Sequence, residues 1–79
     1  MTNIERIMAT VKGQIVDYDM TSRATLFVLV KSDKGNYSIR QSFRNIYGEY
    51  NGFKMVKMMR SVGREVAQME FSEMMSNIQ

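Results

Sequence analysis

The sequence contains no cysteine, histidine, proline or tryptophan. Without cysteine there can be no disulfide, and without cysteine and histidine a zinc or haem site has almost no ligands. The side chains most often used as general base and as thiol nucleophile are missing too. No glycine-rich phosphate loop or nucleophile elbow is present. We therefore expect a protein that is not an enzyme and has no metal or cofactor.

Long apolar runs are also missing, since no stretch approaches the roughly 20 residues that a membrane span requires. The opening MTNIERIMATVKG has no uninterrupted apolar centre and does not look like a secretory signal. We expect a soluble, cytoplasmic protein. The 79 residues should form a single domain, 1–79, with a small core. Because disulfides and metals are excluded, a second subunit is the remaining support, and we predict a homodimer.

Positive charge is concentrated in the middle of the chain. Residues 20–64 hold nine Lys or Arg against two acids, a net charge of +7. Residues 1–19 have a net charge of −1 and residues 65–79 one of −3, which gives the overall +3. Such a block is typical of proteins that bind phosphates, and it would also suit an acidic protein partner.

Local patterns predict a helix followed by strands. Thr2-Asn3-Ile4-Glu5 is a capping box, and apolar residues at helical spacing run up to Gly13, which predicts a helix over about 3–12. From residue 14 the apolar period becomes two. This predicts strands over about 14–19, 25–31 and 36–44. The second of these, TLFVLVK, is apolar on both faces and should be central in the sheet.

The stretch GFKMVKMMRSVGREVAQM, residues 52–69, is predicted to form one long helix with Asn51 as its N-cap. At about 100° per residue its Met and Val side chains fall on one side. Its basic side chains fall on the other, where they form either a solvated face or a binding surface. The basic side chains are Lys54, Lys57, Arg60 and Arg64. The predicted fold class is thus α+β: a helix, a three-stranded antiparallel sheet and a long helix (αβββα).

After Met69 the apolar residues lie about 150° round the helix from the earlier stripe, at about 100° per residue. Either the helix breaks near Glu70, or it continues to about residue 78 and buries a different face. A frayed tail is the alternative. We interpret the second face as the surface that a partner subunit covers. The predicted dimer interface consists of Phe71, Met74, Met75 and Ile78.

Further basic and aromatic residues extend the predicted binding surface. Exposed Tyr rings can stack on unpaired bases, and two Tyr follow the last predicted strand, whereas Tyr37 should lie in the core beside Ile39. The full set of predicted nucleic-acid-binding residues is Lys54, Lys57, Arg60, Arg64, Arg40, Arg44, Lys31, Lys34, Tyr47 and Tyr50.

The order of helix, three strands and helix over residues 3–69 resembles the double-stranded-RNA-binding domain. That resemblance implies that Lys54 and Lys57, at the start of the second helix, contact phosphates across the major groove. The chain is also similar in style to small early proteins of T-even-type bacteriophages, being short, rich in Met and free of Cys and Pro. This second resemblance implies RNA binding and inhibition of a host defence, for example a toxin–antitoxin ribonuclease.

Two functions remain open. The first is a non-enzymatic nucleic-acid-binding accessory protein, with RNA favoured over DNA, that holds phosphates on its basic helix face. The alternative is a phage-type inhibitor or adaptor that docks its basic face on an acidic host protein, for which adaptable Met side chains are well suited. Neither function involves a membrane.

Overall fold

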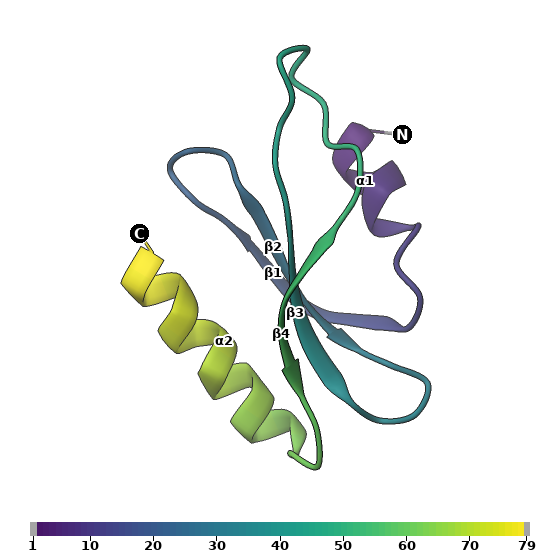
Figure 1. Cartoon of the computed structure of the whole chain (residues 1–79), viewed down its shortest axis with the longest axis vertical. Coiled ribbons are helices and arrows are strands. Elements are labelled where there is room, and N and C mark those ends of the chain that lie inside the picture. Colours follow the sequence, from purple (N-terminus) through teal and green to yellow (C-terminus); the bar gives the residue numbers. More distant parts are fainter. Residues whose placement is uncertain (1, 79) are drawn as a thin grey trace.

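The computed structural model describes residues 2–78, which form a four-stranded sheet with a helix at each end of the chain (Figure 1). The elements are α1 (Asn3–Met8), β1 (Gln14–Met20), β2 (Leu26–Lys31), β3 (Tyr37–Ser42), β4 (Lys54–Met59) and α2 (Arg64–Ile78). All neighbouring strands are antiparallel, and their order in the sheet is the order in the sequence. The α+β class is confirmed, with four strands in place of the three predicted.

The extra strand corrects the largest error of the sequence prediction. Lys54–Met59 pair with β3 and form an edge strand, so the predicted helix over residues 52–69 is wrong. The chain turns at Ser61, which has a φ of +59°, and α2 begins three residues later. Met and Lys favour helices, but pairing with β3 outweighs that local preference. Gly63, which would weaken a helix interior, precedes the true helix instead.

The other boundaries shift by smaller amounts. Helix α1 ends at Met8 rather than near residue 12, because the next residues form turns and Gly13 takes a φ of +108° on entering β1. The capping interaction at its start is confirmed, since the Glu5 amide donates to Thr2 Oγ1 over 3.1 Å. The second and third strands are shorter than predicted, and β1 extends by one residue to Met20.

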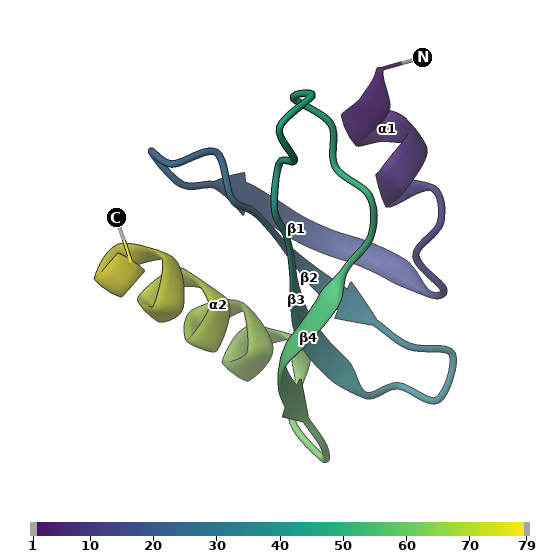
Figure 2. The same cartoon turned by 45° about the horizontal axis from the view of Figure 1, so that its top comes forward.

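Helix α2 covers one face of the sheet, which we call the α2 face (Figure 2). Ala67, Phe71 and Met75 follow one another at intervals of four, so they share one side of the helix, and all three are buried. They pack on buried residues of the inner strands β2 and β3 and of the edge strand β4. These are Phe27, Leu29, Tyr37, Ile39 and Met59.

Helix α1 packs on the opposite face, the α1 face, where Ile7 contacts a second buried cluster. Its members are Leu26, Val28, Val30 and Tyr50. Strand β2 therefore supplies side chains to both cores and is buried from Leu26 to Val30, as its doubly apolar sequence predicted. Within residues 2–78 neither helix is both long and apolar enough to span a membrane.

Candidate nucleic-acid interface

Strand β4 presents its lysines on one face and its exposed methionines on the other. Residues directly opposite in an antiparallel pair share a face. Lys57 lies opposite Ile39 and Lys54 opposite Gln41, so both lysines are on the α2 face. Met55 and Met58 are on the α1 face and are 44% and 47% exposed. A β-bulge between the two halves of the strand adds Val56 and switches the alternation.

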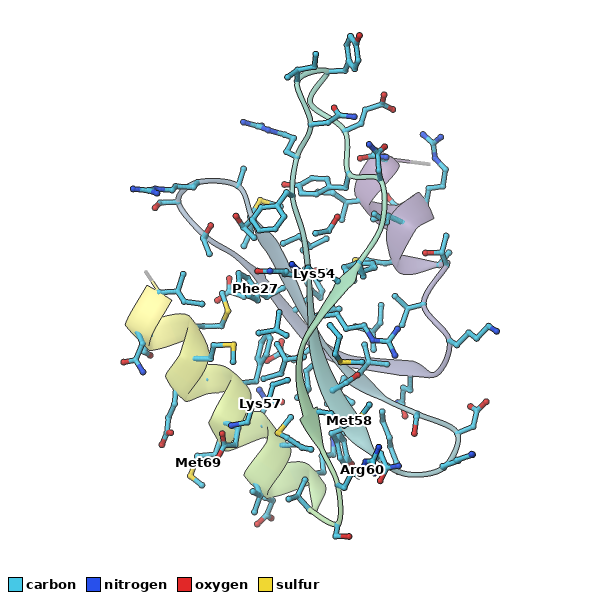
Figure 3. All side chains as sticks on the ribbon, viewed as in Figure 1. Phe27, Lys54, Lys57, Met58, Arg60 and Met69 are labelled. Carbon is cyan, nitrogen blue, oxygen red and sulfur yellow. The ribbon has the colours of Figure 1, made fainter. Side chains whose placement is uncertain are left out.

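Lys54, Lys57 and Arg60 form what we call the basic edge, which follows the outermost strand of the sheet (Figure 3). All three side chains are exposed. At about 3.3 Å per strand residue, Lys54 and Arg60 are about 20 Å apart along the chain. The predicted row of cations on one helix face is therefore replaced by Lys54 and Lys57 on an edge strand and Arg60 directly after its end, and Arg64 alone belongs to α2.

Lys57 is engaged by the helix beside it. Its Nζ donates to Glu70 Oε2 on α2, and the two side chains are 45% and 37% exposed. An ion pair as exposed as this contributes about 0–1 kcal/mol and weakens further with salt. A phosphate could therefore replace the Glu70 carboxylate at little cost, whereas Lys54 and Arg60 have no ion pair among residues 2–78.

A second group of bases lies at the end of the sheet where β4 stops. One row across the four strands consists of Gln14, Lys31, Tyr37 and Met59. At this row the chain enters β1 and β3 and leaves β2 and β4. This arrangement places Lys12, Lys31 and Lys34, which we call the basic end, at the same end of the sheet as Arg60. All three are exposed, and Asp33 is the acid in the same turn. The sequence-based set omitted Lys12, since only strand pairing shows that Gly13 adjoins Lys31.

The remaining predicted bases are dispersed. Arg40 is on the α1 face of β3 and is half-buried, with its Nε donating to Ser38 Oγ over 3.3 Å. Arg44 is exposed beyond the other end of β3, where it forms an isolated bridge with Tyr50. The structure thus brings Lys31, Lys34, Lys54, Lys57 and Arg60 along one edge and end, but not Arg40 or Arg44.

The two tyrosines predicted to stack on bases have opposite surroundings. Tyr47 is 80% exposed, which suits such a contact. Tyr50 is 6% exposed, and its hydroxyl donates to the Ala24 carbonyl over 2.6 Å, so its assignment to the binding surface is wrong. Tyr50 belongs to the core cluster under α1. Tyr37 is buried, as predicted.

The predicted dimer interface is largely internal. Phe71 and Met75 are buried against the chain's own sheet, and Met74 packs at the side of the same cluster. Phe71 and Met75 are therefore unavailable to a partner while the fold is intact, whereas Met74 is partly exposed. Ile78 is 47% exposed. The apolar stripe is rotated because α2 starts at Arg64, so no second subunit is needed to cover it. The homodimer itself stays a prediction.

Among residues 2–78 no three His, Cys, Asp or Glu side chains are grouped so as to hold an ion. Asp17 instead fixes α2 to the first strand, because its Oδ2 accepts a hydrogen bond of 2.6 Å from Gln68 Nε2. The helix is thus joined to both edges of the sheet, through Asp17 on β1 and through Lys57 on β4.

No family model matches the chain, and comparisons with curated proteins and with solved structures also gave no match.

Proposed function

We propose that this protein is a non-enzymatic nucleic-acid-binding accessory protein that holds a single strand along its basic edge, with RNA favoured over DNA. The observation that carries the proposal is the presence of three exposed cations, Lys54 and Lys57 on β4 and Arg60 directly after it, at the end of the sheet that also carries the basic end. Each phosphate that a cation neutralises releases counterions, so affinity should fall as salt rises.

A single strand fits this surface better than a duplex does. Lys54 and Lys57 lie on an extended strand, and Arg60 directly follows it, so none of them is on a helix that could enter or bridge a groove. The mode of duplex binding implied by the double-stranded-RNA-binding domain needs Lys54 and Lys57 at a helix start, and they are in β4. RNA is favoured because proteins that recognise RNA mostly bind its unpaired segments. Such a protein would act in the cytoplasm.

The test is a fluorescence-anisotropy titration with a labelled single-stranded RNA of about 16 nucleotides, near the upper site size of one small binding domain. The double variant Lys54→Glu with Arg60→Glu should bind at least tenfold more weakly. For single strands the slope of log K against log salt should fall by about 0.7 for each lost phosphate contact. Lys57 is left unchanged because a Glu there would face Glu70.

The matched control is Arg6→Glu, which changes the charge by the same amount as either single substitution but lies on the exposed side of α1. It should leave the affinity within about twofold after correction for net charge. Equal weakening by Arg6→Glu and Arg60→Glu would show that only overall charge matters. The absence of measurable binding by the unchanged protein would overturn the proposal. The same RNA and DNA sequences compared side by side rank the two ligands.

The second candidate function, an inhibitor or adaptor that docks on an acidic host protein, is favoured by a different observation. Strand β4 is a free sheet edge that combines exposed Met55, Val56 and Met58 with the lysines. An extended acidic segment of a partner could pair with such an edge. The test is nuclease-resistant capture of one stoichiometric protein that is lost in Met58→Lys and kept in Met69→Lys, a matched exposed methionine on α2. A bacteriophage origin and a toxin–antitoxin target stay predictions from the sequence.

A further inference from the structure

The loop between β3 and β4 exposes three large apolar side chains within five residues. Phe43 is 59% exposed, Tyr47 80% and Ile46 92%. Figure 1 shows this loop projecting beyond the sheet at the end opposite the turn between β4 and α2. Single exposed apolar residues are ordinary on protein surfaces, but adjacent ones at the tip of a projecting loop mark a contact site.

The tip is held in one conformation by its own hydrogen bonds. The Gly48 amide donates to the Asn45 carbonyl over 3.0 Å, and the Asn45 amide donates to the Glu49 carbonyl over 2.8 Å. The side chain of Asn45 closes the turn from inside, since its Oδ1 accepts from the amides of Tyr47 and Glu49. Gly48 has a φ of +79°, as a short hairpin turn with a left-handed last residue requires. Ile46 and Tyr47 are therefore displayed on a preorganised turn.

The base of the loop is fixed to the body of the protein. The Tyr50 amide donates to Asn3 Oδ1, and Asn3 Nδ2 donates back to the Tyr50 carbonyl over 3.2 Å. The Tyr50 hydroxyl reaches the Ala24 carbonyl, so the loop lies against the turn between β1 and β2, next to Arg23. Arg44 lies near the start of the loop and pairs with Tyr50 in an isolated bridge. Arg23 and Arg44 are both exposed.

Turn chemistry alone does not account for the two residues at the tip. The central positions of such turns favour Pro, Asp, Ser or Asn, whereas a β-branched or aromatic residue gains nothing there from packing. Here Ile46 and Tyr47 occupy these positions and contact solvent almost completely. Of the other aromatic residues in the loop, Tyr50 is buried at 6% exposure and Phe43 is 59% exposed. The ring of Tyr47, at the tip, is more exposed than either.

We infer that the tip is a base-stacking element, with Tyr47 packing on an unpaired base and Ile46 contacting the edge of the same stack. The inference rests on the proposed function and narrows its ligand to strands with unpaired bases. Aromatic rings stack on every base type, because each base has a π face, so the contact adds affinity without sequence preference. Arg44, which is exposed in the same loop opposite Tyr50, supplies a cation for a nearby phosphate.

The preorganised turn also explains why stacking here is effective. An ordered tip loses little conformational freedom on binding, so more of the contact energy appears as affinity. A nucleic-acid strand that runs along the basic edge from Arg60 to Lys54 then reaches the loop between β3 and β4, because β4 begins directly after this loop. Phosphate contacts along the edge and a base contact at the tip then act on one continuous strand.

The experiment compares two labelled RNA strands of about 16 nucleotides, one with all its bases and one made abasic throughout its sugar-phosphate backbone. Both carry the same number of phosphates. The unchanged protein should bind the normal strand at least about fivefold more tightly, the least that one stacked base is expected to contribute. Tyr47→Ala should lose that preference, and Tyr47→Phe should keep it because the ring remains.

Two controls separate stacking from other effects. Tyr18→Ala removes another exposed tyrosine, 59% exposed on β1 next to Asp17 and Asp19, and should not change affinity for either strand. The salt slope of Tyr47→Ala should equal that of the unchanged protein, since no phosphate contact is lost. Circular dichroism should show equal melting for all variants, because both tyrosines are exposed.

The outcomes distinguish base stacking at the tip from phosphate binding along the basic edge. Equal binding of normal and abasic strands by the unchanged protein overturns the stacking inference but leaves the basic edge as a binding surface. An equal loss in Tyr18→Ala, or a lower salt slope in Tyr47→Ala, overturns it as well. No binding of either strand removes the proposed function and the inference together.

Discussion

Truncation of Phe71 tests the position of α2 on the sheet most directly. Phe71 is 2% exposed and packs between α2 and the strands on the α2 face. A buried Phe→Ala substitution costs about 3–5 kcal/mol, because transfer energy is lost and a cavity remains. A domain of this length is stable by about 4–12 kcal/mol in total, at about 0.05–0.15 kcal/mol per residue. Phe71→Ala should therefore remove about a quarter or more of the stability.

The matched variant is Met69→Ala on the same helix. Met69 is 54% exposed and points away from the sheet in Figure 3. Its truncation should change the free energy of unfolding by about 0.5 kcal/mol or less. Urea unfolding followed by far-ultraviolet circular dichroism measures both, and the midpoint of Phe71→Ala should fall by at least about 1 M with an unchanged m-value. If Phe71→Ala does not fold, Phe71→Leu serves as a milder probe of the same site.

The predicted helix over residues 52–69 and the observed helix α2 predict opposite rankings for the two substitutions in their cost to the free energy of unfolding. A helix over residues 52–69 would bury Met69 and leave Phe71 on a second face, as the sequence pattern predicted. The structure buries Phe71 and exposes Met69. An unfolding cost for Met69→Ala as large as that for Phe71→Ala would refute the packing described above.

Three further substitutions test other parts of the fold. Gly13→Ala should lower the free energy of unfolding in urea by more than about 1 kcal/mol, since Gly13 has a φ of +108° and the added Cβ would clash with the Lys31 carbonyl oxygen. Gly52→Ala should be nearly neutral, because the space around Gly52 is open. Equal effects of the two substitutions would contradict this account. Tyr50→Phe should cost about 0.5–1.5 kcal/mol through loss of the hydrogen bond to Ala24, and an unchanged melting curve would show that the bond contributes nothing. A double-mutant cycle on Lys57 and Glu70 should give a coupling below about 1 kcal/mol that shrinks in high salt; a larger, salt-insensitive value would mean that the pair is effectively buried.

The sequence predicted the first half of the fold well because its signals are local. The capping box at Thr2, the doubly apolar β2 and the glycine turn before β3 each determine structure within a few residues. Only the element ends differ, by amounts usual for such patterns. The α+β class followed from these elements alone.

The second half could not be predicted in the same way, because KMVKMM is compatible with two structures. Its Met residues match a helical stripe, and Met and Lys both favour helices. What makes it a strand is the open edge of β3, which no local pattern reveals. One usable signal was present: Ala67, Phe71 and Met75 are spaced by four and agree with a helix that starts after Gly63. The stripe then has one face, and the partner subunit invoked to cover a second is unnecessary.

The candidate site shows the same division. Charge along the sequence identified Lys54, Lys57 and Arg60, and their exposure on β4 or directly after it keeps them as candidates although the element is different. Lys12 was missed because the pairing of β1 with β2, and not sequence distance, brings it near Lys31. Tyr47 and Tyr50 have the same chemistry and lie three residues apart, so only tertiary packing could separate the exposed ring from the buried one.

The position of α2 after all four strands has a consequence for how the protein is made. Each strand pairs with its neighbour in sequence, so the sheet can assemble while the chain is still leaving the ribosome. Helix α2 is synthesised last, and until it emerges the apolar side chains of Phe27, Leu29 and Ile39 have no cover. The nascent sheet therefore exposes an aggregation-prone apolar surface until Phe71 and Met75 have been synthesised and can pack on it. A ribosome stalled before residue 64 should hold a chain that binds chaperones, whereas the released 79-residue chain should not bind them.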